Sequence, residues 1–170
     1  MSKNEPEIAV TGNGWMGKGV GSIWSLVKDA FSKVNNEIQI AAFAITESRG
    51  EFFELLGDAL ARKTRVLMIV NRFYDQDLAV RQKLAELEEK YDNFILKNFE
   101  PDDSREDLHA KLIVIDHSIA LVGSANLTWK GLVMNHEIMI KLTGSAAQAI
   151  GGLIDRLSKH PACKPVTPWK

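Results

Sequence analysis

Two patterns of apolar residues recur along the chain and divide it into short strands and amphipathic helices. Compact apolar runs predict buried strands, whereas apolar residues spaced by three and four predict helices with one buried face. The expected strands cover 7–10, 37–45, 65–70, 93–99, 111–116, 119–122 and 133–142. The expected helices cover 22–34, with Ser22 as N-cap, and 48–62, 75–91 and 145–157. This alternation predicts an α/β domain in which helices cover a sheet.

Composition adds few constraints to this picture. The chain has 170 residues, 45% hydrophobic and 25% charged, which is ordinary for a globular protein with its own core. We expect one domain over 1–170, with a loose lead-in to about 18 and a loose tail from about 161. No apolar run approaches a membrane span, no secretory signal is seen, and the single cysteine, Cys163, cannot form an internal disulfide. We therefore expect a cytoplasmic protein without a membrane partner.

The most informative stretch begins at His109. His109-Ala110-Lys111 is followed by four apolar residues and Asp116, and six residues later by Gly123-Ser124-Ala125-Asn126. Side chains alternate along a strand, so the histidine and the lysine point the same way. Gly123 permits a tight bend that turns Ser124 and Asn126 back towards them. An imidazole, an ammonium group and neutral donors together predict a site for a phosphate group.

This spacing, H-x-K-x4-D-x6-G-S-x-N, resembles the HKD signature of the phospholipase D superfamily, with every fixed position occupied. The resemblance extends loosely over 20–157 and is closest to the short bacterial nucleases of the superfamily, which carry one motif per chain and dimerise. It implies a phospholipase D-like layered domain with a central mixed sheet flanked by helices. It also implies that Glu137 orients the histidine, and that 41–46 is the strand before the first long helix.

The resemblance implies a mechanism without a metal or cofactor. His109 would attack the phosphodiester phosphorus and form a phosphohistidine, and a second histidine would protonate the leaving oxygen before water completes hydrolysis. Lys111, Ser124 and Asn126 would bind the phosphate and offset its developing charge. Because the chain holds one motif, the second histidine would come from a second copy, which makes a homodimer a requirement of the mechanism.

Further residues are candidates for weaker roles. Asp116 belongs to the motif and is either a participant in catalysis or, as we favour, a structural residue that holds the loop after its strand. Trp129 and Lys130 follow the Ser124 turn and could stack a base and meet a neighbouring phosphate, or could form a dimer contact. Thr46 and Ser48, with the residues between and after them, could line the same mouth. Arg72, at the end of the next strand, is a further guess.

Several features compete with this interpretation. His117 and His136 are alternative second histidines within the chain, whereas His160 precedes a proline near the tail and is expected to be incidental. Residues 12–18 fit G-x4-G-K, the start of a nucleotide-binding loop, but Gly19 stands where such a loop needs a hydroxyl. A flexible lead-in is the favoured reading of this loop.

Charge shapes the hypotheses about partners. The formal net charge is −1, and 100–107 holds five acids and one arginine just before His109. This acidic loop is either a solvated segment or a gate that weakens the binding of long polyanions. The leading hypothesis is a phosphodiesterase that hydrolyses DNA, RNA or both. The alternatives are a lipid phosphodiesterase of the same superfamily, and a phosphate-binding module without turnover inside a larger complex.

Overall fold

The computed structural model describes residues 5–17, 19–46 and 50–167. Within these residues, nine strands form one mixed sheet in the order β2-β1-β8-β7-β6-β3-β4-β5-β9. The strands are β1 (Glu7–Val10), β2 (Gly21–Ser22), β3 (Glu37–Ala42), β4 (Arg65–Asn71), β5 (Phe94–Phe99), β6 (Lys111–Ile115), β7 (Ile119–Gly123), β8 (Ile138–Thr143) and β9 (Cys163–Pro165). The helices are α1 (Ile23–Ser32), α2 (Glu51–Ala61), α3 (Leu78–Lys90) and α4 (Ser145–Ser158). Two short turns of helix, η1 (Phe73–Asp75) and η2 (Lys130–Met134), complete the described elements.

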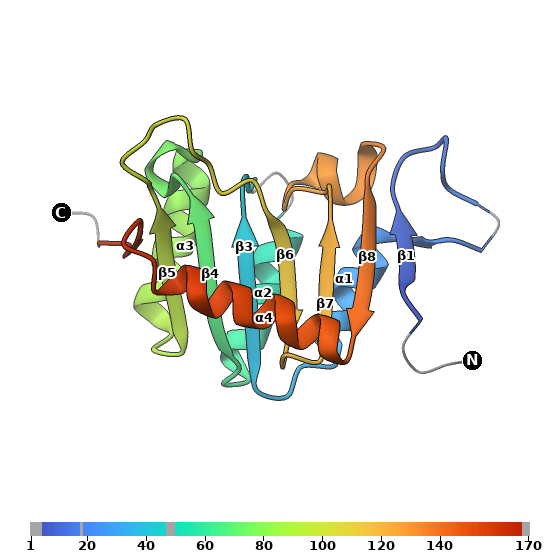
Figure 1. Cartoon of the computed structure of the whole chain (residues 1–170), viewed down its shortest axis with the longest axis horizontal. Coiled ribbons are helices and arrows are strands. Elements are labelled where there is room, and N and C mark those ends of the chain that lie inside the picture. Colours follow the sequence, from blue (N-terminus) through green and yellow to red (C-terminus); the bar gives the residue numbers. More distant parts are fainter. Residues whose placement is uncertain (1–4, 18, 47–49, 168–170) are drawn as a thin grey trace.

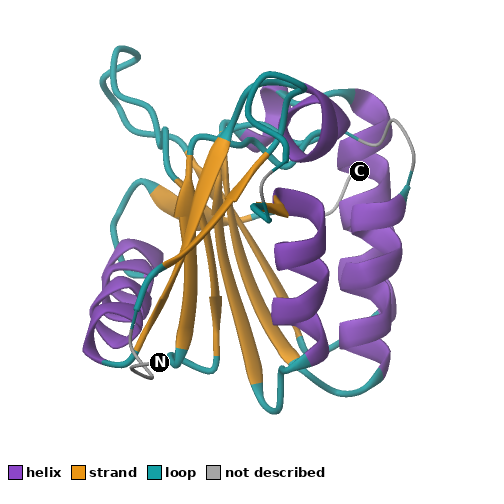
Figure 2. Ribbon diagram, turned by 90° about the vertical axis from the view of Figure 1, so that its right-hand side faces the viewer, coloured by secondary structure: helices purple, strands orange, loops and turns teal. Residues whose placement is uncertain are grey.

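The helices cover both faces of the sheet. Figure 1 shows α4 crossing one face, with α1, α2 and α3 behind the other, and Figure 2 shows the same three layers from the side. The central strands are therefore apolar on both faces, as their continuous apolar runs predict. Ile40 and Met68 belong to the core under α1, α2 and α3, whereas Ala41 and Ile69 belong to the core under α4. The predicted α/β fold with a central mixed sheet is confirmed.

The topology brings several strand ends to one edge of the sheet. β3, β4 and β5 run parallel, and β6 runs antiparallel to β3 with Ala42 opposite Lys111. The carboxyl ends of β3, β4, β5 and β7 and the amino ends of β6 and β8 therefore meet at the same edge, which lies at the top in Figure 1. We call this the site edge. In open α/β sheets, ligands bind beyond the carboxyl ends of the parallel strands.

Two predicted segments differ from the structure. The strand expected over 133–142 begins only at Ile138, because η2 and its closing turn occupy the preceding residues. The tail expected to be loose forms β9, which pairs antiparallel with β5. Ala162, Cys163 and Val166 are buried there, so apolar burial and strand pairing hold a segment whose prolines indicated a loose end. Ser22 caps α1 as predicted, accepting a hydrogen bond from the Ser25 backbone N–H.

Candidate active site

His109 and Lys111 lie together at the site edge. The Lys111 ammonium Nζ is 3.2 Å from His109 Nδ1 and donates a 2.8 Å hydrogen bond to the His109 carbonyl oxygen. The imidazole is exposed, whereas Lys111 is only 8% exposed. The side chains therefore point the same way, as the strand alternation predicts, although β6 itself begins at Lys111.

Phe43 supports both residues, and the sequence analysis did not single it out. Its ring packs edge-on against the His109 imidazole with centroids 4.5 Å apart, and Lys111 Nζ lies 5.0 Å from the ring centroid. The register could have indicated this contact, because Phe43 follows Ala42, the partner of Lys111. Burial lowers the pKa of Lys111, and the Glu137 carboxylate partly offsets this effect. A cation held in partly desolvated surroundings interacts more strongly with an anion than one in bulk water.

Ser124 is held by the residues that open β8. Its hydroxyl donates to Glu137 Oε2 and accepts from the Ile138 backbone N–H at 3.2 Å. Gly123 makes this approach feasible, because a Cβ at that position would lie 2.2 Å from the Ile138 carbonyl oxygen. The other Glu137 oxygen accepts from Asn135 Nδ2 at 3.4 Å. Among the described residues, Glu137 forms no hydrogen bond with His109, so the contact implied by the resemblance is replaced by one to Ser124.

Asn126 lies at the start of the turn that leads into η2. Its side-chain Oδ1 is buried and has no hydrogen-bond partner within the described part of the chain. Such atoms are rare in native proteins and call for a functional or structural reason. Gly131 packs directly on the Asn126 backbone, where a Cβ would lie 2.4 Å from the carbonyl oxygen. The turn therefore fixes this asparagine by close backbone packing.

Asp116 lies at the opposite end of β6 from the catalytic candidates. The length of β6 separates it from Lys111 by roughly 16 Å, and His109 lies further still. Its carboxylate accepts backbone N–H bonds from Asn35, Asn36 and Glu37 at 2.7–2.9 Å. Burial opposes its ionisation, but these backbone donors outweigh burial and hold the pKa below its usual value. The assignment of Asp116 as a catalytic residue is therefore corrected to the structural role that the sequence analysis favoured.

The acidic loop before His109 is anchored to the end of β4. The Arg72 guanidinium donates to Asp107 Oδ1 and to the carbonyl oxygens of Ser104 and Glu106 at 2.9–3.0 Å. Asn71, which is buried, donates to Asp107 and accepts from the Leu108 backbone N–H. The Arg72 and Asn71 hydrogen bonds lower the pKa of Asp107. This network, which we call the β4 anchor, fixes the segment that leads into His109.

The other three histidines are engaged elsewhere. His117 Nε2 lies 3.5 Å from Glu37 and 3.7 Å from Asp155, at the same end of β6 as Asp116. His136 Nε2 accepts the Gly14 backbone N–H at 3.1 Å, and its ring contacts Trp15. His160 Nδ1 accepts the Ala162 backbone N–H. None of these imidazoles joins His109 in a pair.

The loop over 12–19 does not resemble a nucleotide-binding loop in its surroundings. His136 fills the space beside Gly12 and Gly14, where a Cβ would approach the imidazole to within 3 Å. The short strand β2 follows the loop before α1 begins, whereas a nucleotide-binding loop leads directly into its helix. Lys18 lies outside the described residues.

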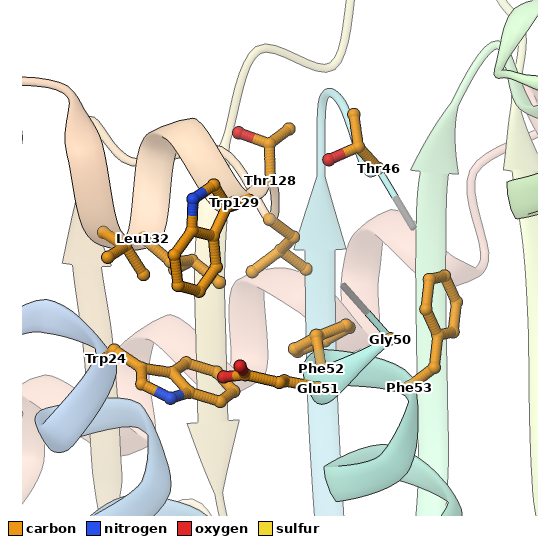
Figure 3. A pocket seen from close by; sticks show the side chains of 11 residues that line it. Trp24, Thr46, Gly50, Glu51, Phe52, Phe53, Thr128, Trp129 and Leu132 are labelled. Carbon is orange, nitrogen blue, oxygen red and sulfur yellow. The ribbon is translucent and has the colours of Figure 1, made fainter. Parts of the chain in front are cut away.

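The residues predicted to contact the substrate beyond the phosphate lie in different places. Trp129 and Thr46 both line a hollow beside the site edge (Figure 3), and the Thr46 backbone N–H donates to the Leu127 carbonyl oxygen at 3.1 Å. Lys130 is exposed at the start of η2. Ser48 lies outside the described residues.

In the part of the chain that the structure describes, no group of three or more His, Cys, Asp or Glu side chains could hold a metal ion, and no helix could span a membrane.

Comparisons with known proteins agree with this geometry. A family model described as "Cardiolipin synthase, PLD-like domain" matches residues 27–157. The DISARM protein DrmC of Bacillus paralicheniformis is 26% identical over 137 residues, which cover 80% of this chain and 56% of that protein. The chain thus spans little more than half the length of this relative.

Two solved structures share the fold. NucT from Helicobacter pylori superposes with a TM-score of 0.77 at 14% identity, over 96% of this chain and all (100%) of that one. Nuc from Salmonella typhimurium, a phospholipase D family member, superposes with a TM-score of 0.71 at 18% identity, over 95% of this chain and 99% of that one. The likeness therefore extends across the whole layered domain.

Proposed function

The chain belongs to the phospholipase D-like family, and from this membership we propose that it is a metal-independent phosphodiesterase that hydrolyses nucleic acid. The observation that carries the proposal is the pairing of His109 and Lys111 at an exposed edge, with Ser124 and Asn126 on the adjacent turn. The resemblance of the motif to that of the short bacterial nucleases of the superfamily supports a nucleic-acid substrate.

The residues act on a phosphodiester in two steps. An unprotonated ring nitrogen of His109 attacks phosphorus, so that an N–P bond forms and the bond to the leaving oxygen breaks. The leaving oxygen takes a proton from a second imidazole. Water then gives a proton to the second imidazole and attacks phosphorus, the N–P bond breaks, and His109 is released. Lys111, with Ser124 and Asn126 as neutral donors, stabilises the charge that develops on the non-bridging oxygens.

The second imidazole comes from a second copy of the chain in this proposal. His117, His136 and His160 are held away from His109 by their own contacts. A two-fold axis through the site edge would bring His109 of two copies to opposite sides of one phosphorus. The active species is therefore a homodimer with one shared site. We expect any sequence selectivity to be supplied by a partner in a larger complex.

The test is a cleavage assay in chelator. Short single- and double-stranded DNA and RNA are incubated with the protein in EDTA, beside His109→Ala and the control His160→Ala. We expect cleavage by the wild type and the control, and loss of cleavage in His109→Ala. Headgroup release from phospholipid vesicles without nucleic-acid cleavage would favour the lipid alternative. Phosphate binding without any turnover would favour a binding module.

A further inference from the structure

An aromatic hollow lies beside the site edge, between α1, α2 and the turn that enters η2. Figure 3 shows Trp24 and Trp129 at its wall, with Phe52 and Phe53 below Thr46. The closed part of the hollow holds only about 20 Å³, and the rest of it is open to solvent. It is shallow, so a flat ring would lie against its aromatic wall and would not be fully enclosed. We call it the aromatic hollow.

Two chain segments lead from the phosphate site to this hollow. Phe43 contacts His109, and three residues later Thr46 lines the hollow. Asn126 belongs to the motif turn, and Leu127, Thr128 and Trp129 directly after it line the same hollow. The two segments are paired through Ile45 and Leu127. Three residues span at most about 10 Å, so the Thr46 side of the hollow lies near enough to the Phe43–His109 contact for the base of the same or the next nucleotide to reach it.

Among the described residues that line the aromatic hollow, Glu51 is the one that carries a charge. Figure 3 shows the Glu51 side chain extending from α2 towards Trp24 and Trp129. Within residues 5–17, 19–46 and 50–167, the Glu51 carboxylate forms no hydrogen bond or ion pair. Its position in the first turn of α2 suits the helix dipole, but Glu54 occupies the same turn and is exposed. The dipole therefore does not explain why a carboxylate faces two tryptophans.

We propose that the aromatic hollow binds one unstacked nucleobase beside the scissile phosphate and that Glu51 selects a base with an exocyclic amine. Aromatic side chains bind bases by stacking, largely without regard to sequence. A carboxylate accepts hydrogen bonds only, so it pairs with the exocyclic amine of cytosine, adenine or guanine. Uracil and thymine offer it only an N3–H group flanked by two carbonyl oxygens, which repel it. This inference rests on the proposed function, because it supplies a site for the base next to the phosphate.

The test compares oligonucleotides that differ only in whether the base carries an exocyclic amine or a carbonyl oxygen at C4, with the accompanying change at N3. Short deoxycytidine and deoxyuridine oligomers differ in the C4 substituent and the N3 proton, and neither has a methyl group. Their dissociation constants are measured by fluorescence anisotropy with His109→Ala protein, which binds without cleaving. We expect deoxycytidine to bind about 5- to 30-fold more tightly. Glu51→Gln brings the two affinities together, whereas the control Glu54→Gln preserves the ratio.

A second pair of variants tests stacking. Trp129→Ala weakens the binding of both oligomers by at least about fivefold. The control Trp15→Ala removes a half-exposed tryptophan that does not line the hollow and leaves both affinities unchanged. Equal affinities for the two oligomers, or a preference that survives Glu51→Gln, overturn the base site.

The wild-type protein separates the failure of the base site from that of the proposed function. Cleavage without base preference overturns the base site alone. Preferential binding of deoxycytidine, with no cleavage of these oligomers or of the DNA and RNA of the chelator assay, overturns the proposed function and leaves the base site standing. Absence of binding and of cleavage across the same substrates overturns both.

Discussion

Replacing Asp116 with asparagine separates the structural part of the motif from its chemistry. The carboxylate accepts three backbone N–H bonds and a fourth, longer bond from Asn35 Nδ2 at 3.3 Å. Asparagine has nearly the same shape and tolerates the left-handed φ of 50° at this position. The variant therefore removes the charge and one acceptor while keeping the backbone conformation. We expect it to lose stability and to retain its rate of turnover.

The size of the loss follows from these bonds. A hydrogen bond to a charged group contributes about 1.5–3 kcal/mol, and one that is lost also leaves its donor without a partner. The contributions of the Asp116 hydrogen bonds do not add fully, and solvent near the carboxylate weakens each of them. The free energy of unfolding should therefore fall by about 2–4 kcal/mol. For a domain of this size that corresponds to a drop in Tm of roughly 6–12 °C.

The pH dependence gives a second readout. The folded-state pKa of Asp116 is lowered, so its stabilising contribution is present above the ordinary value of about 3.9 and is lost as pH falls through the folded value. Thermal melts from pH 7 to pH 3 should show a shallower acid-induced decrease for Asp116→Asn than for the wild type. The surface control Asp103→Asn should change Tm little. A variant with unchanged Tm but greatly reduced kcat would refute the structural assignment.

Three further perturbations test the site. Because burial lowers the pKa of Lys111, tungstate affinity measured by thermal shift should weaken at a lower pH than an ordinary lysine would give. Lys111→Arg should abolish this alkaline decline, and its persistence would contradict the assignment. Gly131→Ala forces a Cβ against the Asn126 backbone and should lower the free energy of unfolding by about 2 kcal/mol and the activity at least tenfold. The control Gly152→Ala, with open space around its Cβ, should lower neither. Equal effects in both variants would show that the close packing on Asn126 is unimportant. Arg72→Ala releases the β4 anchor and should reduce kcat by roughly 10- to 100-fold with little change in KM. The control Arg105→Ala, an exposed residue of the same loop, should not reduce kcat.

The sequence predicted the site where local geometry determines it. Alternation along a strand places His109 and Lys111 together, and the fixed spacing to Ser124 follows from one tight hairpin between β6 and β7. The family assignment from this motif is confirmed by the family model. The proposed catalytic roles of these residues remain predictions, to be tested by the assays described above.

The features that the sequence did not predict depend on contacts between distant segments. The β4 anchor joins Asn71 and Arg72 to a loop more than thirty residues later, which no periodicity reveals. Glu137 pairs with Ser124 because the register of β7 and β8 sets Gly123 opposite Met139 and brings the residues beyond both strand ends together. The tail forms β9 because it pairs with the edge of β5, and the prolines of the tail do not predict that pairing.

The central claim is that His109 carries the phosphoryl group during turnover. A short DNA substrate is mixed with the protein in EDTA, the reaction is stopped in alkali to preserve phosphohistidine, and peptides are analysed by mass spectrometry. The account predicts a nucleotide adduct on the peptide that contains His109, absent from His109→Ala. Cleavage that proceeds in His109→Ala, or an adduct on a different residue, would contradict it.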